Sequence, residues 1–150
     1  MRAQRLAQPM ALVLLALSLG CGSPSPPSRT RFGAQTLAPG LQIPQGLAFA
    51  PDGRLFMTER TGRVRVYQNG TLLAEPALTL TDAFTEDESG ILGLTVHPDF
   101  SANHFIYLAY TANGTRGPVG RVMRFREVDN RFVEGVVMLD DVPAGIVHKG

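Results

Sequence analysis

The chain has 150 residues, a formal net charge of +1, 16 glycines, 11 prolines and one cysteine. A single cysteine excludes a disulfide within the chain, and the sequence lacks the basic stripe expected of a nucleic-acid-binding protein. The many glycines and prolines indicate a turn-rich chain rather than a helical one.

The first 20 residues are typical of a secretory signal peptide. Two arginines precede the apolar run Met10–Gly20, which is too short for a membrane-spanning helix of about 20 residues. The stretch from Leu17 to Cys21 resembles a bacterial lipobox, with Ser18 where leucine is usual, so we expect Cys21 to be lipidated. The alternative is an ordinary signal peptide followed by an incidental cysteine.

A proline- and serine-rich segment follows Cys21. It cannot bury apolar surface, so we expect residues 21–35 to be a lipidated cysteine with a flexible tether and residues 36–150 to be globular. This order predicts an exported protein on the periplasmic side, held by its lipid in a bacterial membrane. Gly22 favours the outer membrane. Loss of residues 1–20 removes two positive charges and leaves a net charge of −1.

Short strands separated by turns are expected from residue 46 onward. They cover residues 46–50, 55–59, 63–67 and 71–74. The third alternates polar and apolar side chains, which is the period of a half-buried strand. Pro51–Gly53, Thr61–Gly62 and Asn69–Gly70 are turn sequences between them.

The same pattern recurs 47 residues later, because Gly46–Asp52 matches Gly93–Asp99 at four of seven positions. Strands at residues 105–110, 121–126 and 132–139 follow in the same order. Four strands per unit match one blade of a β-propeller, whose repeats run about 40–50 residues. We therefore predict an all-β chain with about two blades and the start of a third. Because propellers have about 4–8 blades, we expect a fragment of a longer protein.

Three stretches together resemble the glucose/sorbosone dehydrogenase family. The first comprises residues 43–55, 58–60 and 62–64 (IPQGLAFAPDGRL, TER and GRV), and the second residues 88–94 and 97–100 (ESGILGL and HPDF). The third, His148–Gly150, is similar to the start of the family's HxGGR motif. The resemblance covers residues 36–150 and implies the N-terminal part of a six-bladed propeller that holds pyrroloquinoline quinone (PQQ) and Ca²⁺.

The resemblance implies oxidation of an aldose sugar to its lactone, with hydride transfer to the quinone. It gives His148 the role of general base, and imidazole, with a pKa of about 6.5, suits proton removal near neutral pH. Glu88 stands at a position that lines the active site in some relatives, so it is a candidate substrate-binding residue. Val147 replaces the aspartate of glucose-oxidising members, so glucose itself is not implied.

The family's contacts to PQQ and Ca²⁺ come from later blades. We therefore assign no cofactor or metal ligand in this chain and expect it to be inactive alone. The electron acceptor is not indicated.

Other polar and aromatic residues have more than one interpretation. The acidic run 86–88 could bind a cation, although such a run is more often a solvated loop. We expect His97 to be structural, His104 to be at the surface or partly packed, and the aromatic residues Phe105, Tyr107 and Tyr110 to pack within a blade.

Two other functions share the predicted architecture. One is a non-catalytic propeller at the cell surface that binds a ligand or protein, which Val147 favours. The other is a calcium-dependent lactonase-type propeller, which only the shared architecture supports.

Overall fold

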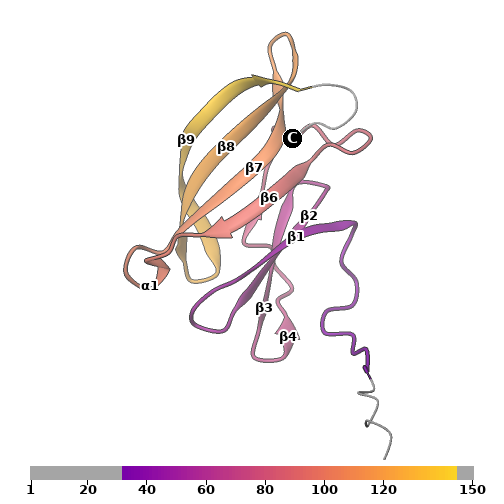
Figure 1. Cartoon of the computed structure of the whole chain (residues 1–150), viewed down its shortest axis with the longest axis vertical. Helices are drawn as coiled ribbons and strands as arrows, with labels where there is room; N and C mark the ends of the chain where they lie inside the picture. The colour runs from indigo at the N-terminus through magenta and orange to yellow at the C-terminus, as the bar shows by residue number, and fades with distance from the viewer. Residues whose placement is uncertain (1–31, 145–150) are drawn as a thin grey trace, which may run out of the picture. The chain divides into compact units, whose positions relative to one another are not determined.

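A computed structural model describes residues 32–144. All of its strands lie in one compact unit that begins at Gln35. They form two antiparallel sheets (Figure 1). The predicted all-β class and the repeated order of strands are confirmed, and the two sheets correspond to two successive blades of a propeller.

The first sheet is a meander of neighbouring strands. It contains β1 (Pro44–Phe49), β2 (Leu55–Glu59), β3 (Arg63–Gln68) and β4 (Thr71–Leu72), with β5 (Leu78–Thr79) also paired to β3. Every residue of β2 is buried, because this strand has neighbours on both edges and packing on both faces. In β3 the buried residues alternate with half-buried ones over the first four positions, as the sequence pattern predicts.

The fourth predicted strand, residues 71–74, is shorter than expected. It ends at Leu72, the chain bends away near Pro76, and β5 then pairs with the other half of β3. The outer edge of the sheet is therefore divided, because proline has no N–H with which to continue the ladder.

The second sheet has longer strands. It contains β6 (Ile91–Val96), β7 (Phe105–Gly114), β8 (Gly117–Val128) and β9 (Arg131–Pro143), with the short helix α1 (Phe100–Asn103) between β6 and β7. The helix was not predicted, because four residues are too few to show a helical period. Beyond Phe132, all of β9 is exposed in the part of the chain that the structure describes.

The two sheets pack together through aromatic and aliphatic side chains. Phe56 of β2 lies with its ring centre 5.4 Å from that of Phe132 and 6.2 Å from that of Phe100, both edge to face. Strand β1 contacts β6, so the first strands of the two sheets are adjacent. The remaining core is formed by buried residues of both sheets, among them Val64, Val66, Ile91, Ile106, Leu108, Tyr110 and Phe125.

The alternating strand directions give the pair of sheets two different ends. One end carries the β2–β3 turn (residues 60–62), the acidic loop between β5 and β6 (residues 86–90) and the β7–β8 turn (residues 115–116). We call it the acidic-loop end. The other carries the β1–β2 turn at residues 50–54, α1 and the β8–β9 turn at residues 129–130, and we call it the Arg54 end.

Replacement of Phe56 by alanine should lower the free energy of unfolding by about 3–5 kcal/mol, because it leaves a cavity where the two sheets meet. Chemical denaturation of the full-length gene product would measure this. Leu37→Ala is the control, since Leu37 is 53% exposed and precedes the sheets. An equal loss in both variants would contradict the central position of Phe56.

Candidate functional site

Of the candidate catalytic, substrate-binding and lipidation residues, Glu88 lies within the described part of the chain. It is exposed on the loop between β5 and β6, at the acidic-loop end. His148, Val147 and Cys21 lie outside the described residues, so their roles stay predictions.

The loop that carries Glu88 packs against the β2–β3 turn. Gly90 has φ +119°, and a Cβ there would lie 2.1 Å from the carbonyl oxygen of Arg60, so only glycine fits. The Gly90 carbonyl accepts a hydrogen bond from Thr111 N–H of β7 at 3.0 Å. The guanidinium of Arg60 donates to the carbonyl of Asp87. The loop is thus fixed from both sheets, while Glu88 itself faces solvent.

The acidic run 86–88 forms an exposed loop. Between residues 32 and 144, no three His, Cys, Asp or Glu side chains come together in a way that could hold a metal ion.

Ser89, next to Glu88, is fully buried, and its hydroxyl has no hydrogen-bond partner among residues 32–144. A buried polar group without a partner costs about 1–3 kcal/mol. This cost is borne inside the fold, because the hydroxyl is itself closed off from solvent.

A buried carboxylate that the sequence analysis did not single out organises the start of β1. Glu59 is fully buried and accepts hydrogen bonds from the backbone N–H of Gln42 at 2.7 Å and from Nε of Arg63 at 2.6 Å. The neighbouring Thr58 hydroxyl accepts from Gly46 N–H at 2.9 Å. The Thr58–Arg60 stretch thus holds the start of the first sheet. The only sequence signal for the role of Glu59 was that a charged residue stands at the end of an apolar strand.

Asp82 links the chain that follows the first sheet to the second sheet. Arg121 Nη1 donates to the Asp82 carboxylate at 2.6 Å, and its remaining donors bind Asp140 at 2.9 Å. The hydrogen bonds to Arg121 lower the pKa of Asp140 below its ordinary value. Burial raises the pKa of Tyr110, whose hydroxyl lies 3.1 Å from Asp82. Tyr110 therefore packs within the blade, as predicted.

His97 and His104 contribute to structure. Nδ1 of His97 accepts the backbone N–H of Asp99 at 3.0 Å and lies 2.9 Å from the Asn103 amide, which confirms the predicted structural role. His104 ends α1 in the left-handed conformation, with φ 56°, and its side chain is 47% exposed. This agrees with the predicted surface position.

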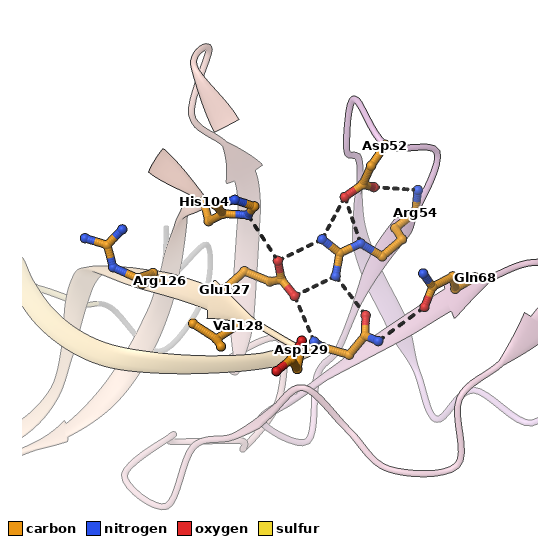
Figure 2. A pocket seen from close by; sticks show the side chains of 9 residues that line it. Asp52, Arg54, Gln68, His104, Arg126, Glu127, Val128 and Asp129 are labelled. Atoms are coloured by element: carbon orange, nitrogen blue, oxygen red, sulfur yellow. Dashed lines mark hydrogen bonds and ion pairs between the residues drawn. The ribbon is translucent and has the colours of Figure 1, made fainter. Parts of the chain in front are cut away.

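A concave region lies at the Arg54 end and has a volume of about 490 Å³. Figure 2 shows Arg54 from the β1–β2 turn pointing toward Glu127 from the end of β8. The two side chains form a bidentate ion pair, with nitrogen–oxygen distances of 2.5 and 2.7 Å. Both side chains are nearly fully buried. The remaining donors of Arg54 bind Asp52 and Asn130.

This arrangement leaves all five N–H groups of the guanidinium paired within the chain. The hydrogen bond to Glu127 raises the pKa of Arg54. Burial alone would raise the pKa of Glu127, but hydrogen bonds from Arg54 and from Asn130 N–H outweigh it and hold that pKa below its ordinary value. The region is therefore a clamp between the two sheets rather than a ligand site.

Glu127→Gln should lower the free energy of unfolding by about 1.5–3 kcal/mol at pH 7, because it removes the buried carboxylate that pairs with Arg54 and leaves Asp52, which is 44% exposed, as the carboxylate partner of that guanidinium. The pKa of Glu127 is depressed in the folded state, so its contribution is present above the ordinary carboxyl pKa of about 4.3 and is lost as pH falls through the folded pKa. The difference in the free energy of unfolding between wild type and variant should therefore become smaller at acidic pH.

The matched control is Glu134→Gln. Glu134 pairs with Arg126 at 2.9 Å but is 66% exposed, so its loss should cost about 0–1 kcal/mol. Denaturation at several pH values distinguishes the two variants. A difference between wild type and Glu127→Gln that is independent of pH would argue against the clamp.

Comparison with known proteins gives one family. Residues 41–150 match the profile of a family described as Glucose / Sorbosone dehydrogenase. The chain is 31% identical over 113 residues to quinoprotein glucose dehydrogenase B of Acinetobacter calcoaceticus, covering 67% of this chain and 23% of that protein. It is 33% identical over 97 residues to Hedgehog-interacting protein of Homo sapiens, covering 59% of this chain and 14% of that protein.

The fold is similar to the crystal structure of the soluble aldose sugar dehydrogenase from Escherichia coli in the apo-form. The TM-score is 0.64 at 28% identity, and the match covers 71% of this chain and 32% of that structure. The chain thus spans about a third or less of the length of each of these relatives.

Proposed function

The chain belongs to the glucose/sorbosone dehydrogenase family, and on that basis we propose that the full-length protein oxidises an aldose sugar to its lactone with PQQ as the oxidant. The observation that carries the proposal is the family match over residues 41–150. A relative named as a quinoprotein glucose dehydrogenase supports the cofactor, and one named as an aldose sugar dehydrogenase supports the substrate class.

The reaction removes two electrons and two protons from the anomeric carbon and its hydroxyl group. The chemistry that PQQ would supply when bound is that of a two-electron acceptor for the hydride of the anomeric carbon. In this proposal His148 accepts the hydroxyl proton, which a sugar hydroxyl does not release unaided at neutral pH. Neutral imidazole can accept it there and release it again to solvent.

Glu88 is proposed to contact the sugar. Its carboxylate is exposed on a loop that both sheets hold in place, and rigid scaffolds commonly present binding residues on such loops. A carboxylate can accept hydrogen bonds from sugar hydroxyls. Val147 leaves the identity of the aldose open.

The described residues do not by themselves fit PQQ and Ca²⁺. At the acidic-loop end the exposed carboxylates of residues 86–88 would repel the carboxylates of PQQ. The described residues also provide no three-ligand metal cluster between residues 32 and 144. We therefore propose that residues outside this range hold PQQ and the Ca²⁺ ion, and assign no contact to either among those described.

His148→Ala should lower kcat/KM for the aldose by about 10²–10⁴-fold, the usual contribution of a general base. The assay is dye reduction by the full-length protein reconstituted with PQQ and Ca²⁺, over a panel of aldoses. Activity of the wild type should fall as pH drops below about 6.5, because protonated imidazole cannot accept a proton.

The matched control is His104→Gln, since His104 lies at the Arg54 end and should leave turnover unchanged. Full activity in His148→Ala would refute the general-base role. If the wild type oxidises no aldose, the proposed enzymatic activity is refuted. That result would favour the second candidate function, a non-catalytic propeller that binds a ligand or protein. The similarity to Hedgehog-interacting protein supports that candidate, as does Val147 in the sequence.

We also propose that the protein is exported and anchored by lipid at Cys21, after a signal peptide over residues 1–20 and before a tether that ends at residue 35. The basis is the sequence of this segment. Among residues 32–144, no helix is long and apolar enough to cross a lipid bilayer.

Cys21→Ser should abolish incorporation of labelled palmitate in a bacterial host and should move the protein from the membrane fraction to the soluble fraction. Ser18→Ala is the control and should keep the label, because lipidation needs the thiol of Cys21. Unlabelled wild-type protein would identify an ordinary signal peptide.

A further inference from the structure

We propose that Arg60 is a positioning residue that holds the loop carrying Glu88, and that it sets the affinity for the sugar through that loop. The link to affinity rests on the proposed function. The holding of the loop rests on contacts within the described chain alone.

The backbone of Arg60 is fixed to the first sheet. Its N–H donates to the carbonyl of Ile43 at 3.0 Å, just before β1. The β2–β3 turn that contains Arg60 is closed by the Gly62 N–H, which donates to the Glu59 carbonyl at 3.0 Å. Arg60 therefore lies at a defined place between β2 and β3.

The acidic loop lies directly on Arg60. The guanidinium Nη1 donates to the carbonyl of Asp87. Gly90 approaches so closely that an added Cβ would lie 2.1 Å from the Arg60 carbonyl oxygen and 2.8 Å from Arg60 Cγ. Both the backbone and the side chain of Arg60 thus contact the residues on either side of Glu88.

The second sheet holds the same loop from its other side. Gly90 accepts a hydrogen bond from Thr111 N–H at 3.0 Å, and Phe84 N–H donates to the Thr111 carbonyl at 2.8 Å. Ser89 N–H donates to Glu86 within the loop at 2.9 Å. Arg60 is consequently the contact through which the first sheet determines where Glu88 lies.

The conformation of Asp87 explains why the arginine side chain is needed. Asp87 has φ +50°, a left-handed conformation that residues other than glycine adopt infrequently. The hydrogen bond from Arg60 stabilises the carbonyl in the orientation that this conformation gives it. Without that bond, Asp87 can return to a commoner conformation, and Glu88, the next residue, must then move.

The first test measures hydrogen–deuterium exchange in the loop and needs no cofactor or sugar. Hydrogen–deuterium exchange of the peptide covering residues 84–92 should be about 3- to 10-fold faster in Arg60→Ala than in the wild-type full-length protein, the change expected for loss of one hydrogen bond. The matched control is Arg131→Ala, because Arg131 also donates to a backbone carbonyl, that of Pro76, at 2.9 Å at an exposed position. Equal exchange in wild type and Arg60→Ala would overturn the proposal.

The second test measures the kinetic constants for oxidation of the sugar. Arg60→Ala should raise KM for the aldose by about 3- to 10-fold with little change in kcat, and Arg60→Lys should recover part of the loss because lysine can still donate to Asp87. In a Glu88→Ala background, Arg60→Ala should raise KM no further, since its effect passes through Glu88. Independent effects of the two substitutions would overturn the link to affinity.

The two tests separate this inference from the proposed function. If the wild type oxidises no aldose, the proposed function fails and the link to affinity fails with it. The exchange comparison would still decide whether Arg60 holds the loop.

Discussion

The bidentate pair between Arg54 and Glu127 joins residues 73 positions apart in the chain, and the packing of the two sheets depends on it. Both charges are buried where the β1–β2 turn meets the end of β8, so neither is compensated by water. Arg54 keeps Asp52 as a partner within its own turn, but the buried Glu127 is paired with Arg54 only if the sheets keep this relative position. The aromatic contacts of Phe56 with Phe100 and Phe132 are then made alongside the pair, and they complete the core between the blades.

The clamp also explains why the two ends of the sheets differ. At the Arg54 end, polar side chains satisfy one another, and the concave surface there offers no free donor on Arg54 (Figure 2). At the acidic-loop end, the carboxylates of residues 86–88 are exposed on a loop that contacts of both sheets hold in place. Packing between the sheets thus supports an exposed loop at the end where the proposed sugar contact lies.

Short-range patterns were sufficient for much of the fold. Alternation predicted β3, the turn sequences predicted where β2 and β3 begin, and the 47-residue repeat predicted a second sheet with the same strand order. The divided outer edge at β4 and β5 and the helix α1 were missed. Both depend on where the chain finds hydrogen-bond partners after a proline or a tight turn, and local propensity does not contain that information.

The sequence by itself determined the class and the repeat, because these follow from residue types at fixed spacings, and its resemblance to a known family made Glu88 a candidate site residue. Only the tertiary structure decided the roles of Glu59, Arg60 and Arg54. Their sequence positions suit ordinary surface charges, and nothing local shows that Glu59 is buried or that Arg54 meets Glu127. A buried charge is defined by partners distant in the chain, and only folding brings those partners together.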